Sequence, residues 1–189
     1  MKNKMLLIVD PQIDFITGSL PVPGAEEAMN SLAGFIKTRQ GEYSAIVLTA
    51  DRHPMNHSSF KKEGGAWPVH CVADSVGAAI WPAIFNELFD SPGKVAVVHK
   101  GENPDVEEYS IFRNSAATKI ILEIVDKEKI DQIDICGLAG DVCVSETIRD
   151  AMTLGTEAKI NVLPAYSPSL DGGKTLGMII SDYGLACGG

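Results

Sequence analysis

The chain has 189 residues, of which 45% are hydrophobic and 22% charged, and its formal net charge is −9 at pH 7. A chain of this length can bury a core of its own, and this composition is typical of a folded globular protein. The negative charge argues against nucleic-acid binding, which requires clustered Lys and Arg. Apolar runs of membrane-spanning length are absent from the sequence. We therefore expect a single domain, residues 1–189, that binds neither nucleic acid nor a membrane.

The N-terminal segment and the cysteines predict a cytoplasmic protein. The sequence starts MKNKMLLIVD, and its apolar stretch is too short for a signal peptide. The four cysteines, at positions 71, 136, 143 and 187, form no Cys-x-x-Cys pair, so a zinc site made of cysteines alone is not expected. Free thiols without an export signal indicate a reducing compartment.

Short β-branched runs alternate with longer helical stretches along the chain. Strands are expected at 5–9, 45–49, 95–99, 133–136 and 159–163, and helices near 24–40, 78–90, 115–128, 145–154 and 172–183. Continuous apolar strands separated by helices predict an α/β fold with a mostly parallel sheet and helices on both faces. The last residues, GLACGG, do not decide whether the sheet has a sixth strand.

Reactive side chains follow the expected strands, at the point where each strand ends. Asp10 ends LLIV, Asp51 follows AIVLTA, Lys100 ends VAVVH, and Cys143 follows ICGLA by a short turn. Ligands of a parallel sheet bind at the carboxyl ends of its strands, where these loops converge. We therefore expect the four side chains to meet at one edge of the sheet.

Cys143 is the candidate nucleophile. It lies in GLAGDVCVSETIRDAM, where a strand passes through a Gly-containing turn into a helix. A helix N-terminus lowers the pKa of a thiol, and the amides of the turn can form an oxyanion hole. The alternative is a small buried core residue. Cys136, within a strand, is expected to be core, and Cys71 and Cys187 carry no signal of a nucleophile.

A cysteine nucleophile also needs a base that takes the thiol proton and an acid that protonates the leaving group. Asp10 can serve as both if burial and a nearby cation tune its pKa, and Lys100 is the candidate cation. Asp14 is the competing carboxylate. His99, inside a strand run, is expected to pack in the core.

A carboxylate and two imidazoles form a candidate metal site. Asp51 and His53, in ADRHPMNHSSF, are two residues apart and share a face in extended backbone, and His70 follows in WPVHC. Such a set suits zinc, iron or manganese with open positions for substrate. Glu63 is a candidate additional ligand, and His57 is a competing one.

Five segments of the chain together resemble the nicotinamidase branch of the isochorismatase-like hydrolases. They are LLIVDPQIDFITGSLPVPGA, ADRHPMNHSSF, WPVHC, HKGENPDVEEYSIF and CGLAGDVCVSETIRDA. The resemblance implies a mostly parallel six-stranded sheet and hydrolysis of nicotinamide to nicotinate and ammonia through a thioester on Cys143. The implied partner is a small molecule, nicotinamide or pyrazinamide, and a homo-oligomer stays open. The implied cofactor is one divalent metal ion, with zinc expected and iron or manganese as alternatives.

The resemblance also assigns roles to individual residues. It implies a catalytic triad of Asp10, Lys100 and Cys143, and an oxyanion hole formed by the amides of Ala139 and Cys143. The implied metal ligands are Asp51, His53 and His70, with Glu63 as a candidate further ligand. The implied aromatic walls for the ring are Phe15, Trp67 and Tyr109. It further implies a cis peptide bond between Leu138 and Ala139.

Two positions depart from the pattern of these hydrolases. Arg52 stands where many members have an aromatic residue, and we expect it to alter the rim of the pocket. Gly140 replaces a common Thr and is expected to loosen the turn before the nucleophile. Three other functions are weighed: an amidase of the same superfamily acting on carbamoyl or ureido substrates without a metal, an isochorismate-cleaving enzyme without the cysteine chemistry, and a non-catalytic flavodoxin-like binding module.

Overall fold

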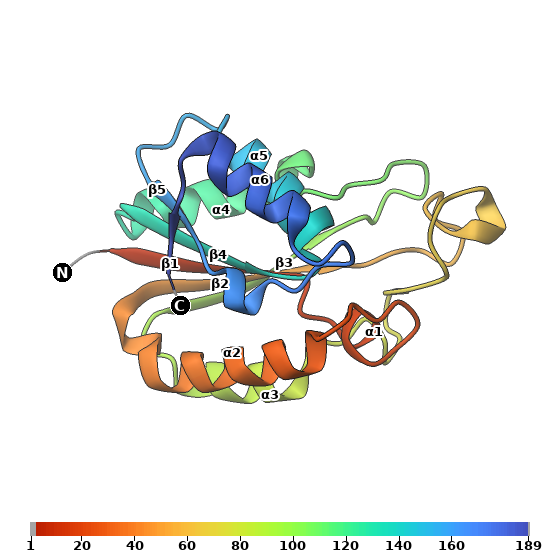
Figure 1. Ribbon diagram of the computed structural model, residues 1–189, viewed down its shortest axis with the longest axis horizontal. Coiled ribbons are helices and arrows are strands. Elements are labelled where there is room, and N and C mark those ends of the chain that lie inside the picture. The colour runs from red at the N-terminus through yellow and green to blue at the C-terminus, as the bar shows by residue number, and fades with distance from the viewer. Residues whose placement is uncertain (1–2, 189) are drawn as a thin grey trace.

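The computed structural model describes residues 3–188, and its centre is a six-stranded parallel sheet (Figure 1). The strands are β1 (Lys4–Val9), β2 (Tyr43–Asp51), β3 (Lys94–Lys100), β4 (Gln132–Gly137), β5 (Lys159–Val162) and β6 (Ala186–Cys187), in the order β3-β2-β1-β4-β5-β6. The chain therefore builds outward from β1 in one direction and then, from β4 on, in the other. The carboxyl ends of β1 and β4 flank the point where the strand order reverses, which is where ligands bind in open α/β sheets.

Helices cover both faces of the sheet, as the alternation of segments predicts (Figure 1). Helices α2 (Ala25–Arg39) and α3 (Pro82–Glu87) pack on one face, and α4 (Ser115–Lys127), α5 (Ser145–Ala151) and α6 (Lys174–Tyr183) pack on the other. A single helical turn, α1 (Ile13–Ile16), follows β1. Successive residues of a strand point to opposite faces, so Leu6 and Ile8 join the core under α2 while Leu7 and Val9 join the core under α4 and α5.

The edge strand β3 is less covered than its apolar sequence predicts. Val95, Val97 and His99 are exposed, because β3 has a neighbouring strand on one side only and α3 has just six residues. The expectation that His99 packs in the core is therefore wrong. Only the alternate residues, such as Val98, turn into the core beneath α4.

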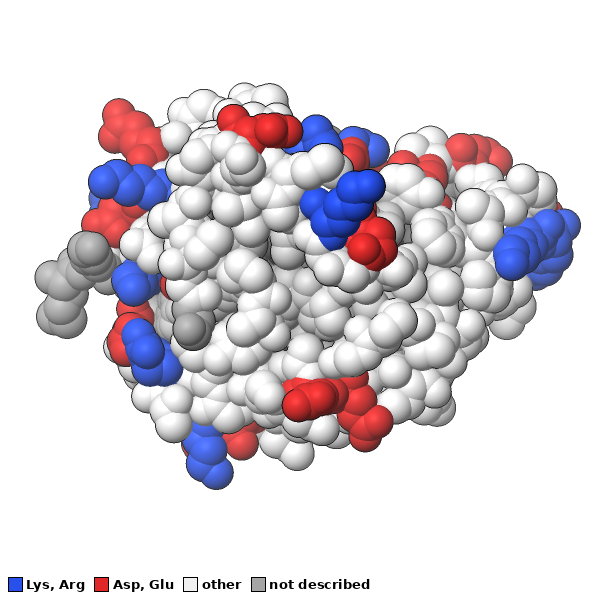
Figure 2. Space-filling view, in the orientation of Figure 1, with Lys and Arg blue, Asp and Glu red and all other residues white. Residues whose placement is uncertain are grey.

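The sixth strand, which the sequence leaves open, is present. Ala186 pairs in parallel with Asn161 of β5, so the six strands that the resemblance implies are confirmed. Between residues 3 and 188, no helix combines the length and the apolar character that crossing a bilayer requires. On the face drawn in Figure 2, the acidic and basic side chains of the described residues are scattered and interspersed rather than gathered into a basic stripe.

Candidate active site and metal site

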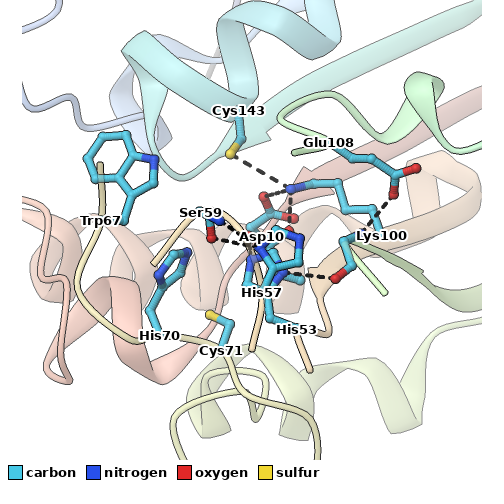
Figure 3. A network of polar contacts seen from close by, with 12 residues as sticks. Asp10, His53, His57, Ser59, Trp67, His70, Cys71, Lys100, Glu108 and Cys143 are labelled. Atoms are coloured by element: carbon cyan, nitrogen blue, oxygen red, sulfur yellow. Dashed lines mark hydrogen bonds and ion pairs between the residues drawn. The ribbon is translucent and has the colours of Figure 1, made fainter. Parts of the chain in front are cut away.

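The four reactive side chains expected at strand ends lie together at the carboxyl edge of the sheet. Figure 3 labels three of them, Asp10, Lys100 and Cys143. Asp10 directly follows β1, Asp51 ends β2 and Lys100 ends β3. Cys143 lies in η5 (Gly140–Val144), the turn between β4 and α5. Their exposed fractions are 0%, 4%, 0% and 6%, so all four are withdrawn from bulk water.

Lys100 is the cation that joins this group. Its Nζ lies 2.9 Å from Oδ2 of Asp10, 2.5 Å from Oδ1 of Asp51 and 3.8 Å from Sγ of Cys143. Buried carboxylates without a partner are strongly destabilising, so the shared ammonium offsets the cost of burying both acids. The same contact links the Asp10–Cys143 pair to Asp51, the first residue of the candidate metal site.

The electrostatics of Cys143 differ from the expectation. Burial raises the pKa of the Cys143 thiol well above its ordinary value, and the Asp10 and Asp51 carboxylates add to the rise while Lys100 opposes it. The expected lowering of the pKa by a helix N-terminus is thus wrong: the α-helix begins only at Ser145, and the thiol is enclosed beside two acids. Cys143 rests as a thiol, so it requires a base.

Asp10 is placed to be that base. Burial raises its pKa, and the attraction of Lys100 offsets only part of this rise. Carboxylate oxygens of Asp10 and Asp51 and the sulfur of Cys143 all lie within 4.8 Å of one another. Asp14, the competing carboxylate, instead holds loops together by accepting the backbone N–H groups of Ser19 and Cys71.

Two polar residues that sequence reasoning missed orient the acids. The Thr49 hydroxyl donates to Oδ1 of Asp10 at 2.6 Å. The Gln12 side chain donates to the backbone oxygen of Asp51 and accepts from its N–H, both at 2.8 Å. Their only signal in the sequence is that a polar residue stands at or near the end of an apolar run.

Asp51, His53 and His70 form the cluster that the spacing predicts. One ligand atom from each lies within 4.8 Å of the others, and all three residues are buried. Nδ1 of His53 lies 2.9 Å from the Gly101 oxygen, and Nδ1 of His70 lies 2.8 Å from the Pro68 oxygen. A ring nitrogen that faces a carbonyl carries the proton, so each Nε2 keeps its lone pair, the arrangement typical of metal-binding histidines.

An unpaired ring nitrogen in the cluster supports the presence of a divalent metal ion. Nε2 of His53 is buried and makes no hydrogen bond among the described residues, and Oδ2 of Asp51 lies 3.6 Å from it. A buried polar atom without a partner is costly, and a metal ion would supply one. The donors, one carboxylate and two imidazoles, suit zinc, iron or manganese and leave positions open.

The candidate additional ligands lie elsewhere. Glu63 is exposed in the 3₁₀ turn η2 (Lys61–Glu63), because that turn folds back on Phe60 and directs the carboxylate to solvent near Lys62. His57 stacks on His53 with ring centroids 4.0 Å apart, but its Nδ1 lies 2.7 Å from Oγ of Ser59. Its Nε2 faces a backbone oxygen at 3.2 Å, so His57 supports the site and leaves no nitrogen for a metal.

A pocket that is partly open to solvent adjoins these groups. Phe15, Trp67 and Tyr109 line it, as the resemblance implies, and Trp67 Nε1 donates to the Tyr109 hydroxyl at 3.1 Å. Glu107 also lines it, and burial raises the pKa of this carboxyl. Sequence reasoning missed Glu107, although it lies within the motif HKGENPDVEEYSIF, because the segment shows no strand or helix period that would fix its direction.

The turn before the nucleophile is tight. The peptide bond between Leu138 and Ala139 is cis, as expected. The N–H of Gly140 donates to the Pro168 oxygen at 2.8 Å, and a Cβ at Gly140 would lie 2.3 Å from Oγ of Ser169. The expectation that Gly140 loosens this turn is therefore wrong, because the glycine allows a second segment to pack closely on it.

Arg52 lies outside the lining of the pocket. Its guanidinium pairs with Asp74 at 3.1 Å and with Glu102 at 3.2 Å, and all three side chains are exposed. The expectation that it alters the pocket rim is wrong, because the side chains of Asp51 and His53 take the inward face of this extended segment and Arg52 takes the other.

Comparisons with known proteins show which family and which solved structures the chain is similar to. A model of the isochorismatase domain matches residues 4–160. A nicotinamidase of Escherichia coli (strain K12) is 36% identical over 182 residues, covering 86% of this chain and 82% of that protein. The pyrazinamidase of Pyrococcus horikoshii, solved in complex with zinc, has a TM-score of 0.82 at 28% identity, with 98% of each chain covered. PnC1 from L. infantum, solved in complex with nicotinate, has a TM-score of 0.82 at 26% identity, covering 98% of this chain and 92% of that one.

The chain belongs to the isochorismatase family. The buried thiol, carboxylate and lysine at the strand ends of its parallel sheet form the site of a cysteine hydrolase. Within that family, a nicotinamidase and a pyrazinamidase are among the proteins to which it is similar.

Proposed function

We propose that the chain is a cysteine amidohydrolase that converts nicotinamide to nicotinate and ammonia. The observation that carries this proposal is the position of Lys100, whose ammonium joins Asp10, Asp51 and Cys143 beneath an aromatic-lined pocket. The name of the Escherichia coli relative and the nicotinate bound by the L. infantum protein support the choice of substrate. Cytoplasmic location and the single-domain extent, residues 1–189, are parts of the same proposal.

The first half of the reaction forms a thioester. Asp10 takes the proton of the Cys143 thiol, whose raised pKa otherwise keeps it neutral. The thiolate attacks the carboxamide carbon, and the amides of Ala139 and Cys143 hold the resulting oxyanion. Asp10 then gives its proton to the departing nitrogen, and ammonia leaves. Lys100 keeps the ionised Asp10 in place through this cycle.

The second half regenerates the thiol. Asp10, again a carboxylate, takes a proton from a water molecule that attacks the thioester. The acid product forms as the carbon–sulfur bond breaks, and the proton on Asp10 returns to the sulfur of Cys143. Each proton that the carboxyl accepts is thus returned within one turnover.

Asp51, His53 and His70 would hold one divalent metal ion, which we propose to be zinc. When bound, it would supply an open Lewis-acid position at which the ring nitrogen of the substrate is held in orientation. Phe15, Trp67 and Tyr109 bound the space for the ring. The zinc in the Pyrococcus horikoshii structure supports this choice of metal.

A second candidate function is a metal-independent amidase for carbamoyl or ureido substrates, which would use the same thiol, acid and lysine. The buried partnerless Nε2 of His53 favours the metal-containing enzyme instead. The test is ammonia release from nicotinamide, pyrazinamide and a ureido amide, with and without chelator. We expect equimolar ammonia and acid from the two ring amides and loss of activity on chelation. Turnover of the ureido amide alone, unaffected by chelator, would establish the rival.

A further inference from the structure

One residue that lines the pocket, Leu170, comes from a segment outside all the catalytic motifs. The segment runs from η6 (Pro164–Tyr166) to the start of α6 and crosses the carboxyl end of the sheet (Figure 1). Within it, Ser167 and Ser169 are buried, whereas Leu170 is 43% exposed. Leu170 lines the same pocket as Cys143, so its side chain stands at the mouth.

The segment is fastened to the turn that carries the nucleophile. The carboxylate of Asp141, two residues before Cys143, accepts the N–H of Leu170 at Oδ1 and the N–H of Asp171 at Oδ2, each at 3.0 Å. The N–H of Gly140 adds a third bond, to the oxygen of Pro168. A carboxylate that accepts two neighbouring backbone N–H groups fixes their positions, because the two bonds together constrain both the distance and the direction of the segment.

The other end of the segment is fixed as well. Asp171 accepts the N–H of Gly173, the N-cap residue of α6, at 3.0 Å and the N–H of Thr175, in the first turn of α6, at 2.8 Å. Leu170 thus lies between two anchors, one on the nucleophile turn and one on a helix. Its place in the wall is set before any substrate enters, which is what a selective site requires.

Four larger aliphatic side chains line the pocket, and Leu170 is the exposed one: Val22 is buried, and Leu20 and Val142 are half-buried. Metal binding or catalysis requires the side chains of Asp51, His70 and Cys143, whereas an aliphatic side chain can only fill space. One methylene more or less in an apolar pocket changes discrimination between substrates by roughly 10- to 200-fold. Substrate size is therefore set most directly by an aliphatic residue at the mouth.

We propose that Leu170, held in position by Asp141, determines how large a ring substituent the pocket accepts. This inference rests on the proposed amidase function. Leu170 and Asp141 act as specificity and positioning residues: the first bounds the space and the second keeps the first in place.

The test compares kcat/KM for nicotinamide with kcat/KM for nicotinamides methylated at each free ring carbon, by ammonia release. In Leu170→Ala we expect the ratio for at least one methylated isomer to rise about tenfold or more over wild type. Asp141→Asn can accept only one of the two N–H groups, so it should move the same ratio in the same direction by a smaller factor. A general loss of folded protein would lower both rates together and leave the ratio unchanged.

One matched variant serves as the control. Met178→Ala removes an exposed apolar side chain from α6. It should keep the wild-type ratio. An unchanged ratio in Leu170→Ala, with wild type active on nicotinamide, would overturn this inference alone. Inactivity of the wild type on every ring carboxamide would overturn the proposed function instead.

Discussion

Lys100 is fully buried, and three acidic or ionisable groups surround its ammonium. A buried ion pair adds little to stability, but removing one partner leaves an uncompensated charge that costs roughly 3–5 kcal/mol. A chain that keeps such a group uses it for more than folding. Here the Lys100 ammonium opposes the rise that burial causes in the pKa of Asp10, next to a thiol whose pKa burial has also raised.

The role of Asp10 as base and acid predicts the effect of its closest isostere. Asp10→Asn keeps the shape and can still accept the Thr49 hydroxyl, but it cannot take or return a proton. We expect kcat for nicotinamide to fall by roughly 10²- to 10⁴-fold while the protein stays folded. Steady-state ammonia release and circular dichroism measure the two quantities. Asp126→Asn, on the surface, is the matched control, and activity of Asp10→Asn equal to that control would rule out the role.

The Thr49 hydroxyl predicts a change in pH dependence. Burial raises the pKa of Asp10, and the hydrogen bond from Thr49 is one of the contacts that lower it. Thr49→Val removes that bond at nearly constant volume, so the pKa of Asp10 rises further. The base must be ionised to work, so the acid limb of the kcat/KM profile should move to higher pH. Thr38→Val, on the exposed side of α2, should leave the profile in place, and a limb that stays put or moves to lower pH in Thr49→Val would contradict the account.

At the scale of elements, the turn η5 is held between β4, α5 and the segment that precedes α6. Gly140→Ala would place a methyl group 2.3 Å from Oγ of Ser169 and 2.4 Å from the Ser167 oxygen. Such overpacking costs about 1–3 kcal/mol, so we expect thermal unfolding to show a Tm lower by about 2–10 °C. Gly34→Ala is the control, because Gly34 lies in α2 with no atom near its missing Cβ.

In the control, Gly34→Ala, the Tm should change in the opposite direction. Alanine in an exposed helical position is about 0.5–1 kcal/mol more favourable than glycine, so Gly34→Ala should raise Tm slightly. A Gly140→Ala protein as stable as Gly34→Ala would mean that the turn and the segment do not pack as tightly as the structure has them.

Site residues at the ends of strands can be predicted from the sequence, whereas those in irregular segments cannot. Asp10, Asp51 and Lys100 end apolar runs, and a parallel sheet has only one place for strand ends to meet, so their meeting is predictable. Leu170 and Glu107 lie in irregular segments without a period, and their approach to the pocket depends on long-range bonds such as that of Asp141 to Leu170. The prediction that His99 is buried is wrong for a related reason, since an apolar sequence does not say which strand lies at the edge of the sheet.

At the scale of the whole molecule, three strands and two loops contribute to one metal site and one thiol. Because Asp51 bonds Lys100, occupation of the metal site and the geometry of the thiol centre are linked through a single contact. A metal bound to the folded state only adds about 2.7 kcal/mol at a concentration 100 times its Kd. For a protein of this size that corresponds to a rise in Tm of about 5–10 °C.

Metal removal and return therefore test the site independently of turnover. We expect chelation to lower Tm by several degrees and added zinc to restore it, as measured by calorimetry. His70→Ala should lose this response, whereas His99→Ala, altered on the exposed edge strand, should keep it. An equal response in both variants would place the metal elsewhere.

The central claim is that Cys143 attacks the carboxamide, and the most direct measurement is ammonia release from nicotinamide by Cys143→Ala. Removing the sulfur leaves Asp10 and Lys100 paired and the metal ligands intact, so the variant should fold and bind zinc as the wild type does. The account predicts no ammonia above the uncatalysed background, together with an acyl adduct on the wild-type protein that mass spectrometry detects during turnover. Ammonia release by Cys143→Ala at the wild-type rate would contradict it.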